Sequence, residues 1–200
     1  MVIKGKKITV VGLARSGAGA ARLLSLMGAE VTVTDKRPEV ELIDMVKGLG
    51  PSVKLALGGH PEEVFAADLI VVSPGVPLEI RPIASAKAKG IPVIGELELA
   101  YRIMQGAGVS DLGLVKDTAS IPNPQPPTHF MAITGSNGKS TTTTLLDHMM
   151  RKAGFNTIFG GNIGNALTEE IYKIATSNEQ RTTSDRWGQK LITHHSLLIA

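Results

Sequence analysis

The 200-residue chain contains no cysteine. This absence excludes disulfides, thiolate zinc sites, iron–sulfur clusters and cysteine nucleophiles, and it is compatible with a reducing compartment. Aromatic residues make up only 4% of the chain, so its core has to be built from Val, Ile, Leu and Ala. No apolar run approaches the roughly 18 residues that a membrane span needs. The 21 Lys and Arg exceed the 18 Asp and Glu by only 3, which is too small an excess to indicate nucleic acid as a partner.

Short apolar runs alternate with helical patterns over the first half of the chain. The apolar runs cover residues 7–11, 30–34, 53–57, 68–72 and 91–94, and helical spacing covers residues 18–27, 82–89 and 96–105. Continuously apolar strands that alternate with helices are typical of a parallel sheet covered on both faces. We therefore expect an α/β domain over residues 1–105.

A change of composition divides the rest of the chain. Residues 106–129 contain prolines 122, 124, 126 and 127 and predict an extended, semi-rigid linker. A second α/β unit follows over residues 130–175, with strands at 130–134 and 155–159, a helix at 139–151 and a further helix ending near residue 175. Residues 176–200 hold the only tryptophan, Trp187, and show no clear period until Leu191. We expect this tail not to supply the next strand and helix of the second unit.

The strongest motif lies between a strand and a helix of the second unit. It reads Gly135-Ser136-Asn137-Gly138-Lys139-Ser140-Thr141. The first amides of a helix have no intrahelical partner and attract anions, and glycines let the backbone wrap a phosphate. Lys139 suits the β- and γ-phosphates and Ser140 suits Mg²⁺. Ile133 stands where the standard pattern has a glycine, so this is a shorter variant. It predicts a nucleoside triphosphate site; a lysine-bearing turn without a ligand is the alternative.

A second glycine-rich loop, Gly12 to Gly19, also joins a strand to a helix. It departs from G-x-G-x-x-G because Ala14 stands at the middle glycine. Asp35 follows about 20 residues on, where dinucleotide-binding folds place the acid that binds ribose. Lys36 and Arg37 come directly after it and better suit a ligand that carries phosphate. The loop predicts a ligand site, and a tight turn that only packs helix on strand stays open.

Two weaker signals also follow predicted strands. Ser73-Pro74-Gly75-Val76-Pro77 lies at the carboxyl edge of the first sheet, where such folds bind ligands, although a structural turn fits it as well. Gly160 to Gly164 exposes Asn162 at a strand end, and a plain Asn turn fits equally. The five histidines show no metal-ligand spacing. After Gly164 we find no apolar strand that ends in Asp or Glu, the usual second ligand of Mg²⁺ in phosphoryl transfer.

The order and spacing of these segments resemble the Mur ligases of peptidoglycan synthesis over about residues 5–175. The segments that carry the resemblance are 12–17, 35–37, 73–77, 91–105, 132–142 and 160–164. The resemblance implies a cytoplasmic, monomeric α/β enzyme. A Rossmann-like parallel-sheet N-terminal domain would hold a UDP-sugar, and a P-loop-type α/β ATP-binding domain, truncated in this chain, would follow it. Within the family, the match is to members that join D-glutamate to UDP-N-acetylmuramoyl-L-alanine.

The resemblance also implies a reaction and a set of residues. ATP phosphorylates the substrate carboxylate, and the amine of D-glutamate then attacks this acyl phosphate to give an amide, ADP and phosphate. By position, the uridine and diphosphate would be lined by Arg15, Ser16, Asp35, Lys36, Arg37, Ser73, Pro74 and Gly75. Asn162 would reach the sugar-linked part of the substrate. ATP would be bound by Gly135, Ser136, Asn137, Gly138, Lys139, Ser140 and Thr141, with Lys139 catalytic and Ser140 on Mg²⁺.

Several of the family's parts have no counterpart in the sequence. These are a strand with a Mg²⁺-binding glutamate, a later histidine, a carbamylated lysine and the C-terminal domain. We therefore expect a truncated and inactive form of the ligase. The alternative is a non-catalytic module that binds a UDP-sugar or nucleotide. A third interpretation, an NAD(P)-dependent oxidoreductase, does not account for the second glycine loop with its Lys-Ser-Thr ending.

Overall fold

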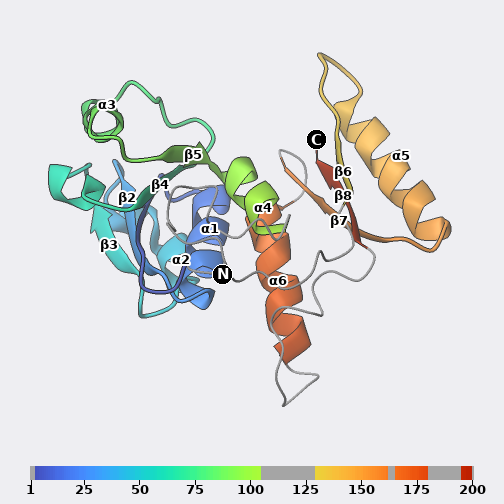
Figure 1. Ribbon diagram of the computed structural model, residues 1–200, viewed down its shortest axis with the longest axis horizontal. Coiled ribbons are helices and arrows are strands. Elements are labelled where there is room, and N and C mark those ends of the chain that lie inside the picture. Colours follow the sequence, from blue (N-terminus) through green and yellow to red (C-terminus); the bar gives the residue numbers. More distant parts are fainter. Residues whose placement is uncertain (1–2, 105–128, 162–164, 180–194, 200) are drawn as a thin grey trace, which may run out of the picture.

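The computed structural model describes residues 3–104, 129–161, 165–179 and 195–199 (Figure 1). Its strands form two sheets. The first has five strands in the order β3-β2-β1-β4-β5, and the second has three in the order β6-β8-β7. Every pair of neighbouring strands is parallel. The predicted α/β class is therefore confirmed, and each glycine-rich loop belongs to its own sheet.

The first sheet is built from the five predicted runs, with bounds shifted by one or two residues. Its strands are β1 (Lys7–Val11), β2 (Glu30–Asp35), β3 (Lys54–Leu57), β4 (Leu69–Val72) and β5 (Val93–Gly95). The helices between them are α1 (Arg15–Leu26), α2 (Ile43–Lys47), α3 (Arg81–Ala88) and α4 (Glu96–Met104), with 3₁₀ turns at η1 (Glu39–Glu41) and η2 (Glu62–Phe65). The short α2 was not predicted, since five residues are too few to show a helical period.

Both faces of this sheet are buried. Ile8 and Val10 of β1 pack in one cluster with Leu24 of α1. Val11, which points to the opposite face, packs in another cluster with Phe65 and with Ile83 of α3. Successive residues of a strand point to opposite faces, so a strand covered on both sides is apolar throughout. The continuous runs in the sequence therefore reflect a central sheet with helices on both sides.

The second sheet is made by β6 (His129–Ala132), β7 (Asn156–Gly160) and β8 (His195–Ile199), together with α5 (Lys139–Lys152) and α6 (Leu167–Glu179). Helix α6 lies between this sheet and helices α1 and α4 of the first unit (Figure 1). Its Leu167 and Ile171 share a buried cluster with Leu23 of α1 and Ala100 of α4. The two units therefore meet through an apolar contact that runs across α6.

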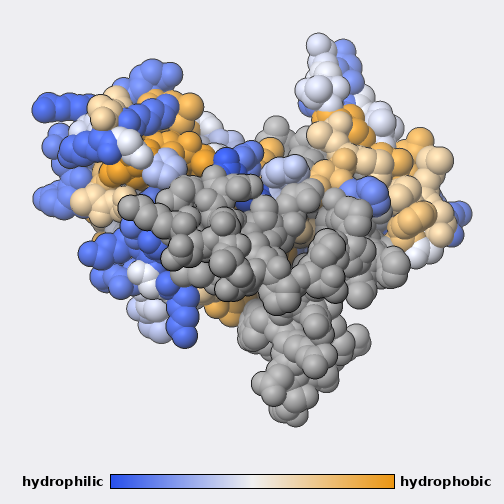
Figure 2. Space-filling model, in the orientation of Figure 1, coloured by the Kyte–Doolittle hydropathy of each residue, from blue (hydrophilic) through white to orange (hydrophobic). Residues whose placement is uncertain are grey.

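Helix α5 is covered less completely than α1, α3 and α4 of the first unit. Thr143 is its buried residue, whereas Leu145 and Met149 are 57% and 56% exposed. Phe155, just beyond the helix, is 48% exposed, and Figure 2 shows apolar residues gathered over this part of the surface. The second unit therefore buries less apolar surface than the first. In the part of the chain that the structure describes, no helix is long and apolar enough to cross a bilayer.

The expectation that residues 176–200 do not supply the next strand of the second unit is wrong. Helix α6 continues past residue 175 to Glu179, and β8 is the middle strand of the sheet, hydrogen-bonded to β6 and β7. Residues 129–132 and 156–160 are its partners. The strand reads His-Ser-Leu-Leu-Ile, so it is apolar over only three residues, and its pairing partners lie far away in the sequence. The predicted linker, apart from His129, and residues 180–194 lie outside the described residues, so the predicted domain boundaries stay predictions.

Candidate ligand-binding loops

The loops that follow β1 and β4 meet at the carboxyl edge of the first sheet. These two strands are neighbours, and the chain leaves them in opposite directions along the sheet, which makes this edge the point where ligands bind in such folds. The Ser73 hydroxyl donates a hydrogen bond to the Gly12 carbonyl at 2.7 Å, and both residues are buried. Two of the segments singled out in the sequence are therefore joined directly.

The glycines of the first loop are required by this close approach. A Cβ atom at position 17 would lie 1.9 Å from the Gly12 carbonyl oxygen and 2.7 Å from the Ser73 Oγ. Gly12 itself has φ of 93°, in the left-handed region that favours glycine. Helix α1 starts at Arg15, three residues earlier than the apolar spacing of residues 18–27 predicts. Its preceding residue, Ala14, offers no side-chain cap, so the first amides of α1 are not capped by its side chain.

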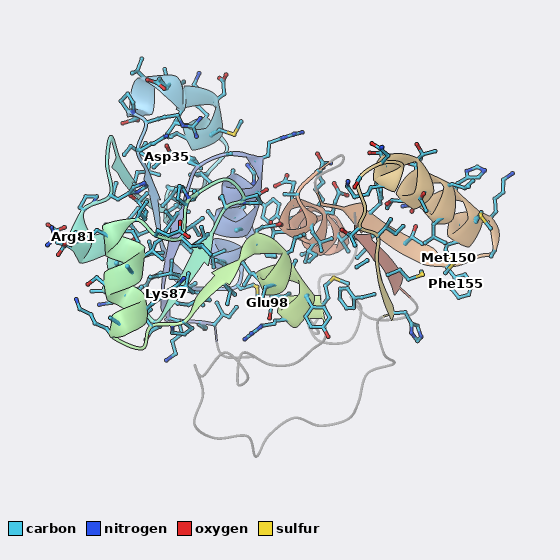
Figure 3. All side chains as sticks on the ribbon, turned by 90° about the horizontal axis from the view of Figure 1, so that it is seen from above. Asp35, Arg81, Lys87, Glu98, Met150 and Phe155 are labelled. Carbon is cyan, nitrogen blue, oxygen red and sulfur yellow. The ribbon has the colours of Figure 1, made fainter. Side chains whose placement is uncertain are left out.

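Asp35 at the end of β2 binds the loop that follows β1 and also binds Arg37. Its Oδ2 accepts hydrogen bonds from the Leu13 N–H at 2.7 Å and from Arg37 Nη2 at 2.9 Å. Its Oδ1 accepts from the Arg37 N–H at 2.9 Å and from Arg37 Nε at 3.0 Å. Arg37 also donates to the Leu13 carbonyl at 3.0 Å. Asp35 is 4% exposed, and Figure 3 shows it in the first unit, far from Met150 and Phe155.

The electrostatics of Asp35 follow from these contacts. Burial alone pushes the pKa of its carboxyl group upward, but the hydrogen bonds from Arg37 and the Leu13 N–H outweigh it and lower the pKa to about 2. A carboxylate has about four lone-pair positions, and all four of those on Asp35 are used within the protein. A ribose that approached as in a dinucleotide-binding fold would have to displace one of these bonds. The oxidoreductase interpretation loses its main support.

Other residues predicted for the first site surround this edge. Arg15, Lys36, Pro74 and Gly75 are exposed, and Ser16 and Arg37 are half-buried. Arg15 and Ser16 stand in the first turn of α1, and Lys36 and Arg37 follow β2. The arrangement brings basic side chains and the N-terminus of helix α1 to one edge of the sheet, which suits an anionic ligand. Which of these residues contact a ligand stays a prediction.

His60 lies at the same edge, although the sequence indicates only a solvated position for it. Its Nδ1 lies 3.0 Å from the Thr34 hydroxyl, and its ring meets Phe65 edge-on with 6.5 Å between ring centres. Burial lowers the pKa of His60, and the charge of Lys36 adds to the effect, while Asp35 opposes it. The only signal in the sequence was its position directly after the glycines that follow β3.

The second loop, between β6 and α5, has the backbone expected of a phosphate cradle. Gly135 and Gly138 have φ of 149° and 78°. Gly138 directly precedes the first residue of α5 and offers no side chain to cap the helix. The Lys139 ammonium group folds back onto this loop and donates to the Gly135 carbonyl and, at 3.5 Å, to the Ser136 carbonyl. Residues 134–138 and Ser140 are exposed. Lys139 is therefore already placed over the loop, where an anion would meet both its charge and the helix amides.

The donors of this loop fit a phosphate accompanied by a hard cation. Nothing lies within 4 Å of a Cβ built at Gly138, so the loop leaves open space next to the first turn of α5. Ser140 and Thr141 offer hydroxyl oxygens there, the ligand type that Mg²⁺ accepts. No group of three or more His, Asp or Glu that could hold a metal occurs among residues 3–104, 129–161, 165–179 and 195–199. Asn162 lies outside the described residues.

Comparison with known proteins shows which family the first unit resembles. Residues 6–95 match the family model described as the MurD-like N-terminal domain of Mur ligases. Those residues are therefore similar to the N-terminal domain of Mur ligases. They comprise all five strands of the first sheet, both loops at its carboxyl edge, and Asp35 with Arg37. The resemblance read from the sequence is confirmed over this part of the chain.

The relatives extend the likeness beyond the first unit. The chain is 47% identical over 173 residues to UDP-N-acetylmuramoylalanine–D-glutamate ligase of Geotalea daltonii, covering 86% of this chain and 33% of that protein. It is 43% identical over 181 residues to the enzyme of the same name from Geotalea uraniireducens, covering 90% of this chain and 34% of that protein. The chain thus spans about a third of the length of these relatives.

A solved structure supports the fold. A UDP-N-acetylmuramate:L-alanyl-gamma-D-glutamyl-meso-diaminopimelate ligase from Neisseria superposes with a TM-score of 0.51, covering 98% of this chain and 52% of that one at 15% identity. At that identity the likeness concerns the fold alone.

Proposed function

We propose that this chain is the amino-terminal part of a cytoplasmic ATP-dependent ligase that joins D-glutamate to UDP-N-acetylmuramoyl-L-alanine for peptidoglycan synthesis. The observation that carries the proposal is the presence of two separate glycine-rich loops, each between a parallel strand and a helix, in one chain. The relatives named above, which this chain matches at 43% and 47% identity, support the substrates.

The first loop would hold the UDP-sugar. Its diphosphate would lie against the first turn of α1, near the exposed Arg15 and Lys36. Arg37 is fixed by two side-chain hydrogen bonds to Asp35, at 2.9 and 3.0 Å, so little rotamer freedom is lost when a ligand contacts it. Asp35 therefore acts through Arg37 and the Leu13 amide, and its own role is to position them.

The second loop would hold ATP. Lys139 would exchange its bonds to the Gly135 and Ser136 carbonyls for bonds to the β- and γ-phosphates, where it stabilises charge on the transferring group. Ser140 would hold Mg²⁺, which supplies further neutralisation of phosphate charge when it is bound. Fixed donors of this kind lower the barrier because they are oriented before the reaction begins.

Binding experiments on the 200-residue chain test the proposal directly. Titration calorimetry should detect UDP-N-acetylmuramoyl-L-alanine and Mg²⁺-ATP at two independent sites. Lys139→Ala should weaken ATP about tenfold or more and leave the UDP-sugar unchanged, since a charge-assisted bond contributes about 1.5–3 kcal/mol. Lys152→Ala, at the far end of the same helix, is the matched control and should bind ATP normally. Failure to bind either ligand would refute the proposal.

A phosphate-release assay separates the ligase from the alternative. Release that depends on both UDP-N-acetylmuramoyl-L-alanine and D-glutamate would establish ligase activity in this chain. Binding of both ligands without release would leave a non-catalytic binding module for residues 1–200. The same assay on a longer protein that includes the remaining two thirds of the relatives' length would then show whether turnover returns.

A further inference from the structure

The start of α6 is attached to the first unit by a buried carboxylate. Glu96, the first residue of α4, is 3% exposed. Its Oε1 accepts hydrogen bonds from the Thr168 N–H at 2.8 Å and from the Thr168 hydroxyl at 2.6 Å. Thr168 is the second residue of α6 and is fully buried. A residue 72 positions earlier in the chain thus caps the helix that follows the second sheet, a place that a local side chain usually takes.

Helix α1 forms the other side of this contact and requires a glycine there. A Cβ atom at Gly19 would lie 2.9 Å from the Thr168 Oγ1 and 3.0 Å from the Glu169 backbone nitrogen. The first turn of α6 therefore rests on the backbone of α1. Gly19 lies within the same helix that begins at the first ligand loop, so the second unit touches the element that carries the first site.

One turn further along α1, Arg22 fixes the neighbouring residue of α6. Its Nη2 and Nε donate to Glu169 Oε2 at 2.5 and 3.1 Å, and the two side chains are 21% and 19% exposed. Arg22 Nη1 also donates to the Gly48 carbonyl at 3.2 Å, and its guanidinium lies 5.9 Å from the centre of the Tyr172 ring. These contacts hold α6 in rotation as well as in position.

These hydrogen bonds and the ion pair fix the orientation of α6 on the first unit, which apolar packing alone does not. Leu167 and Ile171 supply attraction between the units, but the hydrophobic effect is non-directional and tolerates sliding. Hydrogen bonds weaken steeply once their geometry is lost. The bonds of Glu96 and Arg22 therefore select one orientation among those that the apolar contact allows.

We propose that Glu96 is a positioning residue, which fixes the second α/β unit in one orientation on the first and so sets the spacing of the two ligand loops. The connection runs from the first loop through α1 to α6, and from α6 to β7 and the second sheet (Figure 1). The consequence for catalysis rests on the proposed function: a carboxylate held by one unit reacts with a phosphate held by the other only when their separation is controlled.

The absence of cysteine makes a distance measurement straightforward. Cysteines introduced by K87C in α3 and T144C in α5 take spin labels at exposed positions of the two units (Figures 1 and 3). Pulsed electron–electron double resonance between the two spin labels of the ligand-free chain should give one narrow distance distribution. E96A should replace the narrow peak by a broad distribution. E96Q should keep the narrow peak of the unmutated chain, because the amide oxygen of glutamine can still accept both hydrogen bonds from Thr168.

Two further variants separate positioning from stability. E98A removes a carboxylate from the same helix whose partner, Arg102, lies one turn away at 2.6 Å, and it should leave the narrow peak intact. Figure 3 shows Glu98 on α4. Gly19→Ala raises the helix propensity of α1 yet places a Cβ against Thr168, so it should broaden the distribution without weakening that helix. Gly19→Ala also carries the test by itself if E96A does not fold.

The width of the distance distribution and the ligand affinities together test the positioning role of Glu96. A narrow distribution in both E96A and Gly19→Ala, or a broad one in the unmutated chain, would overturn the proposal. ATP and UDP-sugar affinities measured on the same samples should be unchanged in E96A, because the hydrogen bonds that Glu96 accepts come from Thr168 of α6. If the unmutated chain shows the narrow peak but binds neither ligand, the proposed function fails while the positioning role of Glu96 stands.

Discussion

Asp35 offers the sharpest test of how the first loop is held together. In Asp35→Asn, one of the two carboxylate oxygens becomes an NH₂ group, which would face the guanidinium of Arg37 in either orientation and also the N–H of Leu13 in one of them. Folding lowers the pKa of this carboxyl group from its ordinary value of 3.8 to about 2. A difference of that size corresponds to about 2 kcal/mol of stability at neutral pH, and the side chain is only 6% exposed, so solvent screens little of it.

The pH dependence has a definite sign. A carboxyl group whose pKa is lower in the folded state stabilises the fold above its unfolded pKa, and this contribution disappears as the pH falls through the folded pKa. The stability difference between the natural chain and Asp35→Asn should thus be full at pH 7. It should begin to shrink below about pH 5 and should be nearly gone at about pH 2. Other acids titrate in both proteins, so taking the difference removes their contribution.

Urea denaturation followed by circular dichroism at pH 7, 5, 4 and 3 measures this difference. Asp44→Asn, an exposed carboxylate in the first turn of α2, is the matched control and should stay within about 0.5 kcal/mol of the natural chain. The reasoning is refuted if Asp35→Asn loses less than about 0.5 kcal/mol at pH 7, or if its deficit stays constant down to pH 3.

Three further substitutions test the packing and the titration of the same unit. Gly17→Ala should destabilise the chain by about 1–3 kcal/mol in urea, because its Cβ would overlap a backbone oxygen at 1.9 Å, whereas Gly59→Ala, with open space around it, should be nearly neutral. Leu24→Ala should cost about 2–5 kcal/mol because Leu24 is fully buried, and Leu145→Ala, at a side chain 57% exposed, should cost far less in the same assay. Burial lowers the pKa of His60, so its ring resonances should titrate below pH 6.5 in nuclear magnetic resonance, and its contribution to stability should fall as the pH drops below 6.5. His60→Gln should remove that pH dependence; a midpoint at or above 6.5 would contradict the burial argument.

The site could be predicted from the sequence in its parts but not in its contacts. Glycines at 12, 17, 135 and 138 stand out because only glycine tolerates such turns and close approaches next to a strand end. The sequence also placed Asp35 correctly at the end of β2. It assigned Asp35 to a ligand, whereas the structure gives its oxygens to Leu13 and Arg37. Which partner a carboxylate takes depends on loops that fold against it, and no spacing along the chain encodes that.

Local patterns were enough for the elements of the first sheet. Runs such as Lys7–Val11 and Leu69–Val72 are short, apolar and bounded by turn residues, and a strand buried on both faces leaves that signature wherever it occurs. Helix α5 was likewise visible, because a glycine loop precedes it and a glycine follows it. These features depend on residues close together in the chain, so the sequence alone determines them.

Long-range pairing required the folded chain. Strand β8 is the centre of the second sheet because β6 and β7 supply hydrogen bonds on both its sides, whereas its own sequence is apolar over only three residues. Glu96 looked like an ordinary helix residue until α6 brought Thr168 against it across 72 positions. The order of strands and the capping of one helix by another arise from contacts between distant segments. Such contacts are chosen by burial and hydrogen bonding in three dimensions, for which the order of residues gives no local sign.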